Sequence, residues 1–418
     1  MFLLYNYSVE LEQTHHYITY SRRNIMIICL SRSFQTAFLV FLIAFSASSL
    51  AEEFSRTEVL KLNTSKIMDT LSDALKVHDE IPTLESSNWL TRDKKSAQSD
   101  LDKIISKAVD LFESETINQL RKTYRQLENR IADENNKISQ YRTERVLAVR
   151  EEQSTRTKLL PGETMKSWLA VSKGDYDKLI AMAENNLAGY EQSRETVLGE
   201  MSIALSAIGM ELNPEQLQVL LSSITGDSVM EMSVAFNAIK DMTEKLAELT
   251  SASGEDLEYA KKYYGMVVIL HEIIVTMQEN FINDIDKEYL PQLKSYRQVA
   301  LNNIKVARAL AHTSGHSSAL QTNMESNQQV INVIDLYTKV LNGQKNKVKA
   351  ALKVSLHEKK IADNTYSTVT VSSAVVGMIR KGSETFEQLI SLQMPEVHEF
   401  ENKEIQKEFE KLTQRLKS

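Results

Sequence analysis

The chain has 418 residues, a formal net charge of −7, and only 12 glycines and 5 prolines. This acidic balance excludes a protein that binds nucleic acid through a basic face, since phosphate neutralisation needs clustered Lys and Arg, and we expect no nucleic acid partner. Average usage of Gly and Pro is about 7% and 5%, so this chain has room for few turns and is predicted to form long helices.

Residues 1–51 have the pattern of a leader with a secretory signal peptide. Three arginines precede an apolar run at 37–45, and small residues then lead to Ala51; the arginines are Arg22, Arg23 and Arg32. This order of n-region, h-region and cleavage site predicts cleavage after Ala51, which leaves the mature chain periplasmic or secreted. An uncleaved anchor is the alternative, but about nine strongly apolar residues are short for a membrane span of about 20.

The start of the leader is open between two methionines. Residues 1–25 are polar for a leader, which favours Met26 over Met1 as the start. The only cysteine, Cys29, precedes the apolar run. A chain cleaved after Ala51 therefore has no thiol for a disulfide, a nucleophile or a metal site.

We expect residues 52–418 to form a single elongated helical body. The capping-box pair Ser55 and Glu58 begins a first helix. A heptad-like pattern then appears at Ile117, Leu120, Tyr124, Leu127, Ile131, Glu134, Ile138, Tyr141 and Arg145. No Gly or Pro interrupts this region, so we predict one long heptad-bearing helix over about 99–160, about 90 Å long at 1.5 Å per residue.

Turn signals divide the chain after this helix. Pro161-Gly162 should reverse the chain, so that a helix over 164–210 is antiparallel to the heptad-bearing helix. Asn213-Pro214 is an N-cap followed by proline at the first helical position, and it should open a short helix. Asn342-Gly343 predicts a break or a local irregularity between two later helices.

The most apolar part of the mature chain is a central helix predicted over about 254–290. Only His271 and Glu272 interrupt its long apolar run, in which Val267 and Ile274 are core candidates. A helix that is apolar nearly all round belongs inside a bundle. The run is too short for a membrane span and has a charge near its middle. We expect this helix to continue past a proline with a kink.

His271-Glu272 resembles the start of the zinc motif H-E-x-x-H, but Val275 occupies the position of the second ligand. We interpret His271 as a buried histidine with a satisfied hydrogen bond. Together with Glu272 it would set the register of the bundle. His312 and His316 have helical metal spacing but lie around a glycine in a predicted loop. No catalytic, metal or cofactor-binding residue is predicted.

The stretch 364–379 has no charged residue and is rich in Thr, Ser and Val. A strand is an alternative, but no other segment offers a pairing strand, so a buried helix against the central helix is favoured. The second alternative is a concealed membrane-inserting arm, with Val371, Val375 and Ile379 on its apolar face.

The last helix, predicted over 396–418, is charge-dense and amphipathic. Its narrow apolar stripe consists of Phe400, Ile405, Phe409, Leu412 and Leu416. Such a stripe can pack on a partner helix. We therefore expect Phe400, Phe409 and Leu416 to lie on surfaces for a protein partner or for self-association, together with a second group from the heptad pattern: Leu120, Leu127 and Ile131.

The predicted fold class is all-α, an elongated antiparallel helical bundle with long coiled-coil-like helices. The leading functional hypothesis is an exported, non-catalytic protein that acts as a scaffold, tether or adaptor in the cell envelope. The alternative is an α-helical pore-forming protein that inserts an apolar arm, either 364–379 or 204–210. Membrane contact is possible in the first hypothesis but not favoured, and an enzyme with an unfamiliar site is the third hypothesis.

Overall fold

The computed structural model describes residues 54–86, 92–149, 151, 170, 172–253, 256–314, 318–368, 372–393, 400 and 403–417. These residues contain many helices and no strand, which confirms the predicted all-α bundle. Phe54–Ser418 forms one compact unit. The leader, its h-region at 37–45 and the cleavage site after Ala51 lie outside the described residues.

Short helices begin the described chain: α2 (Arg56–Leu60), α3 (Thr64–Glu80) and α4 (Lys94–Val109), with 3₁₀ turns η1 (Ile81–Thr83) and η2 (Asp110–Phe112). The predicted capping box is confirmed, since the Ser55 and Glu58 side chains each accept from the other's backbone N–H. Helix α2 is only 5 residues long because Lys61 adopts a left-handed conformation, with φ 23°.

The predicted single helix over 99–160 is wrong. After α4 the chain breaks at η2, and α5 (Glu115–Leu147) begins a new helix. Phe112 is completely buried at the break. Ser114 is the N-cap of α5, and its hydroxyl accepts from Ile117 N–H. The same hydroxyl donates to the carbonyl of Val59 in α2, which links the start of α5 to that helix. The heptad-bearing helix therefore has 33 residues and a length of about 50 Å.

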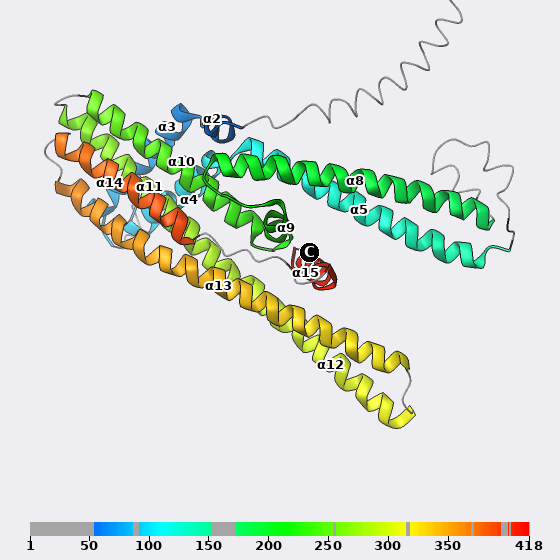
Figure 1. Cartoon of the computed structure of the whole chain (residues 1–418). Coiled ribbons are helices and arrows are strands. Elements are labelled where there is room, and N and C mark those ends of the chain that lie inside the picture. The colour runs from blue at the N-terminus through cyan, green and yellow to red at the C-terminus, as the bar shows by residue number, and fades with distance from the viewer. Residues whose placement is uncertain are drawn as a thin grey trace, which may run out of the picture. The chain divides into compact units, whose positions relative to one another are not determined.

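Helix α8 (Lys173–Ala207) is antiparallel to α5, as predicted. Ion pairs fix the direction: Arg145 of α5 meets Asp177 near the start of α8, and Glu128 meets Arg194 farther along. The two helices form the α5–α8 hairpin seen in Figure 1. The Pro161-Gly162 turn lies outside the described residues.

Helices α9 (Pro214–Ser222) and α10 (Gly226–Ala252) meet at a bend of 116°. Asn213 caps α9 and Pro214 occupies its first turn, as predicted. A Cβ at Gly226 would lie 1.9 Å from the carbonyl oxygen of Leu220. Only glycine therefore allows the chain to turn this closely.

The central helix is confirmed. Helix α11 (Leu257–Asp284) buries every residue from Val267 to Val275 except Glu272. It continues through the π-helical segment η3 (Ile285–Tyr289) into α12 (Leu290–Ser314). The predicted continuation of the helix past Pro291 is confirmed. A π-helical segment precedes the proline, because proline has no backbone N–H to donate to a regular helical turn. The expectation that this region is too short for a membrane span is wrong, because the helix Leu257–Thr313 is long and apolar enough by length and composition. However, 72% of its apolar window is buried in the fold.

The chain ends with α13 (Ser318–Thr368), α14 (Ser372–Gln393) and α15 (Lys403–Lys417). The predicted break at Asn342-Gly343 is wrong, because the Asn342 amide donates to the carbonyl of Thr338 within a continuous helix. Leu341 and Gln344 are buried beside it, and this packing outweighs the helix cost of glycine, about 1 kcal/mol. The described last helix begins at Lys403, later than the predicted start at 396.

The body surrounds α11, which packs against α3, α4, α10, α13 and α14. In Figure 1 the second antiparallel pair, α12 and the first part of α13, forms the α12–α13 hairpin. One continuous core runs through the body and includes the stretch Val267–Ile274 of α11. The fold therefore consists of a packed body and two helical hairpins.

Candidate functional site

His271 is buried where α11 faces α14. Its ring lies 4.7 Å from the ring of Phe386, centroid to centroid, and a Cβ at Gly382 would lie 3.7 Å from its Nε2. Burial lowers the pKa of His271 to about 4, so the imidazole is neutral at pH 7. The predicted satisfied hydrogen bond is wrong for Nδ1, which has no partner among the described residues. His271 therefore packs largely as an apolar ring.

Glu272 begins a chain of charges that links three helices. Its Oε2 lies 2.7 Å from Nζ of Lys359 on α13, which lies 3.5 Å from Oδ2 of Asp363. The other oxygen of Asp363 lies 3.6 Å from Nε2 of His78 on α3. We call Glu272, Lys359, Asp363 and His78 the polar cluster.

The charges of the polar cluster stabilise one another. Burial would lower the pKa of Lys359, but Glu272 and Asp363 outweigh it and raise that pKa. Burial would raise the pKa of Asp363, but His78 and Lys359 outweigh it and lower that pKa. The nearby Asp363 carboxylate raises the pKa of His78, and Asp79 adds to this effect. This mutual pairing suits a group that holds α3, α11 and α13 in one register.

A close helix contact lies next to the polar cluster. A Cβ at Gly265 would lie 2.7 Å from the Leu75 methyl carbons and 2.8 Å from the Tyr366 ring. The Tyr366 hydroxyl donates to Asp79 across 2.8 Å, and Lys261 lies 5.4 Å above the Tyr366 ring. Burial, followed by Asp79, raises the pKa of Tyr366. The described residues contain no group of three or more His, Cys, Asp or Glu that could hold a metal ion.

The heptad candidates for a partner surface are covered by the chain itself. Ile131 is buried, and Leu120 and Leu127 are partly buried against the core. Together with the buried Tyr124, Ile138 and Tyr141, these residues form the heptad face of α5, and this face packs against α8. The prediction that these residues face a partner is wrong because α8 already occupies that position.

The candidates near the C-terminus are also covered. Phe409 stacks on Tyr337 of α13 with centroids 3.9 Å apart, and Phe400 meets Phe409 edge-on at 5.1 Å. Leu416 is buried. The Tyr337 hydroxyl accepts from Ile224 N–H and bonds to Thr413 of α15. Helix α15 therefore uses its apolar stripe to dock on the body, and its prediction as a free partner surface is wrong.

The predicted apolar arm at 364–379 consists of two helix ends. It contains the last turn of α13 and the beginning of α14, so the preference for helix over strand is confirmed for its described residues. Val375 and Ile379 are 0% exposed, in a helix that packs against α10, α11 and α13. Val371 lies outside the described residues.

The most exposed apolar side chains lie at positions that the sequence candidates did not include. On α12, Val299, Val306 and Leu310 are 55%, 59% and 47% exposed. At the end of α5, Val146 and Leu147 are each 76% exposed. A signal for α12 was present in the sequence, because no Asp or Glu occurs from Tyr289 to Met324 although the whole chain is acidic.

The interior of the α12–α13 hairpin explains this exposure. After Leu293, the buried residues of α12 are all alanines, Ala300, Ala307 and Ala311, with Ile304 half-buried beside them. The larger Val299, Val306 and Leu310 lie to one side of this alanine line. They therefore have no covering element among the residues that the structure describes.

Comparisons with known proteins give no relative: no protein-family model, curated protein or solved structure matches the chain.

Proposed function

We propose that the protein is an exported, non-catalytic tether or scaffold of the cell envelope, which binds a protein partner through the end of its α5–α8 hairpin. The single observation that carries this proposal is the placement of exposed apolar side chains. Val146 and Leu147 at the end of α5 are each 76% exposed, whereas exposed apolar side chains of the body, such as Leu257, Ile361 and Met378, are at most about half exposed. Export itself is proposed from the leader at residues 1–51.

The end of the α5–α8 hairpin has the composition of a protein-binding surface. A shallow pocket there is lined by Asn135, Ile138, Ser139, Arg142, Thr143, Val146 and Leu147. Its charged neighbours are already neutralised, because Arg142 pairs with Glu184 and Arg145 pairs with Asp177. An apolar centre with a polar, electrically balanced rim is typical of a protein interface.

The proposal is tested by photo-crosslinking in the native cell envelope. A photoreactive amino acid at Leu147 should form a covalent adduct with an envelope protein, identified by mass spectrometry. The matched control is Lys122, which is exposed on the same helix away from the hairpin end. Equal labelling at the two positions, or a chain that stays in the cytoplasm with residues 1–51 intact, would contradict the proposal.

The pore-forming alternative has a definite energetic requirement. Release of α14 would expose Val375, Ile379, Phe386 and Leu389, all of them 0% exposed in the fold. Exposing each such side chain costs about 1.5–3 kcal/mol. No feature of the described residues favours that release, and the alternative is tested by dye leakage from liposomes with wild type and Val375→Asp.

A further inference from the structure

We propose that the exposed face of α12 docks on an anionic phospholipid membrane surface. This inference rests on the proposed tether function and names a second attachment, separate from the protein contact at Leu147. The docking face consists of an apolar flank, Val299, Val306 and Leu310, and a basic flank, Lys294, Lys305 and Arg308.

The charge of this segment is opposite to that of the chain. From Tyr289 to Met324 there are four Lys or Arg residues and no Asp or Glu, whereas the chain has a net charge of −7. Arg297 is neutralised by Asp335, with Nε 2.8 Å from Oδ1. Lys294, Lys305 and Arg308 are exposed and have no ion pair with a carboxylate among the described residues. Arg308 shares a pocket with Glu325 of α13 but forms no ion pair with it, and Lys294 and Lys305 extend the basic flank that can attract an anionic surface.

Helical geometry places the two flanks on either side of the alanine line. At roughly 100° per residue, Val299, Val306 and Leu310 fall within about 40° of one another. Lys294, Lys305 and Arg308 fall on the opposite side of the alanine line, with Leu301, which is 38% exposed. The exposed arc between the flanks has only uncharged, mostly small residues. A helix with an apolar flank, a basic flank and no acidic residue is typical of one that lies in a membrane interface.

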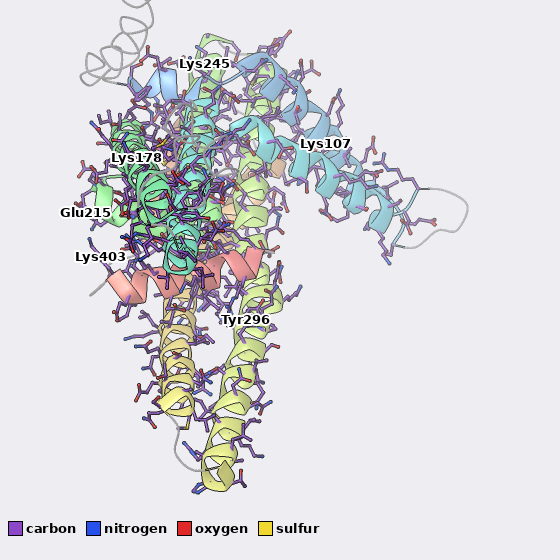
Figure 2. The ribbon with its side chains drawn as sticks, turned by 90° about the vertical axis from the view of Figure 1, so that its right-hand side faces the viewer. Lys107, Lys178, Glu215, Lys245, Tyr296 and Lys403 are labelled. Atoms are coloured by element: carbon purple, nitrogen blue, oxygen red, sulfur yellow. The ribbon has the colours of Figure 1, made fainter. Side chains whose placement is uncertain are left out.

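The position of α12 leaves this face accessible. The Tyr296 hydroxyl donates to the Arg415 carbonyl, 3.1 Å away, which marks where α15 crosses the hairpin. Figure 2 labels Tyr296 at this crossing and shows α12 and α13 continuing beyond it. There α12 packs on α13, and no other described element makes an extensive contact with it.

A membrane surface fits these features better than a second copy of the chain. Two α12 faces packed together would bring the cations of both copies close to one another, without acidic residues to neutralise them. The apolar flank, from Val299 to Leu310, is about 17 Å long, and three side chains cover far less than the ≈800 Å² per partner of a standard protein interface. The free energy of binding that these three apolar side chains do not provide can come from electrostatic attraction, about 1 kcal/mol per basic residue near an anionic membrane. With four basic residues, α12 suits the interface and not a span.

The test uses vesicle co-sedimentation of residues 52–418, which contain the compact unit Phe54–Ser418. We expect binding to vesicles of equal parts phosphatidylglycerol and phosphatidylcholine, and much weaker binding to phosphatidylcholine alone. The triple variant Lys294→Gln, Lys305→Gln, Arg308→Gln should bind the anionic vesicles about 100-fold more weakly, from about fivefold per charge. The matched control removes three exposed lysines of α13, as Lys339→Gln, Lys353→Gln and Lys360→Gln, and should keep most of the binding.

A second measurement reports the depth of the apolar flank. Since the only native cysteine is Cys29, Val306→Cys in residues 52–418 can be labelled with a polarity-sensitive dye. Its emission should shift to the blue with anionic vesicles, whereas a dye on Lys339→Cys should not shift. Equal loss of binding in the two triple variants, no binding by the wild type, or dimers that Val306→Asp dissociates would overturn the lipid proposal. None of these results would affect the crosslinking at Leu147, so failure of the two proposals is distinguishable.

Discussion

The two hairpins are built on opposite uses of large and small side chains. The α5–α8 hairpin places Tyr124, Ile131 and Ile138 between its helices and joins their flanks with ion pairs such as Glu128–Arg194. The α12–α13 hairpin places alanines between its helices and leaves Val306 and Leu310 outside. Along its length the first hairpin buries its large apolar side chains and exposes Val146 and Leu147 only at its end, whereas the second exposes Val306 and Leu310 along α12.

The difference shows that a heptad pattern does not by itself identify a partner surface. The α5 pattern is the more regular in sequence, and its partner is α8 of the same chain. In α12, the alanine line allows close approach to α13, so the larger residues beside it remain exposed. The small residues therefore indicate the internal seam, and their larger neighbours indicate the external face.

The largest expected effect comes from removing a seam residue of α5. Ile131→Ala should lower the free energy of unfolding by about 2–4 kcal/mol, because a large buried side chain leaves a cavity. Val306→Ala on α12 should change it by less than about 0.5 kcal/mol, since that side chain is exposed. Urea unfolding of both variants measures the difference. Similar losses in the two variants would contradict the contrast between the hairpins.

Acid should lower the free energy of unfolding of the protein through His271. The folded pKa of His271 is about 4 against an ordinary value of 6.5, so the unfolded chain binds more protons between these values and stability falls as pH falls from 6.5 to 4. The full contribution is about 3 kcal/mol at 1.36 kcal/mol per pKa unit. His271→Leu should flatten this part of the stability curve, measured by urea unfolding at several pH values.

Two other groups give the control for this acid effect. The lowered pKa of Asp363 adds stability that is also lost as pH falls, so some acid sensitivity should remain in His271→Leu. The raised pKa of His78 has the opposite sign, because its contribution is present below pH 6.5 and is lost as pH rises through the folded pKa. His78→Gln should therefore lower stability below pH 6.5 and remove the fall in stability that accompanies a rise in pH above 6.5. An unchanged acid slope in His271→Leu would rule out its assigned role.

Enlarging the alanine line should disturb the second hairpin. Ala307→Leu should cost about 1–3 kcal/mol, because extra methyl and methylene groups force α12 and α13 apart. Ala309→Leu, on the exposed side of the same helix, is the matched control and should be nearly neutral. Hydrogen exchange of α12 amides would locate the effect. Faster exchange in the control variant as well would argue against a close alanine contact.

The smallest effect is expected at an ion pair of the first hairpin. Arg194→Met should cost about 1–2 kcal/mol, because it leaves Glu128 partly buried near Glu410 without its cation. Burial, and next the charge of Glu128, already raise the pKa of Glu410. Arg130→Met removes an exposed arginine of α5 and should have little effect. Thermal unfolding compares the two, and equal midpoints would show that the pair contributes nothing.

The sequence predicted the helical class, the antiparallel reversal after α5 and the burial of Val267–Val275, because periodicity and the lack of breakers are local properties. It failed at Ser114 and at Gly343, because distant contacts decide whether the helix ends or continues: Ser114 bonds to Val59, and Gln344, next to Gly343, bonds to Thr225. It also misplaced the partner surfaces. Whether Ile131 or Phe409 faces solvent depends on the positions of α8 and Tyr337, which no local pattern specifies.

The continuity of α11, η3 and α12 has a mechanical consequence. The chain from Leu257 to Ser314 is helical throughout, so one stiff rod joins the centre of the body to the far end of the hairpin. Its π-helical segment is held at Asp286 by Lys345 of the neighbouring helix, 2.6 Å away. The same continuous helix therefore carries both Leu310 on the exposed face and His271, whose ring packs on Phe386 in the body.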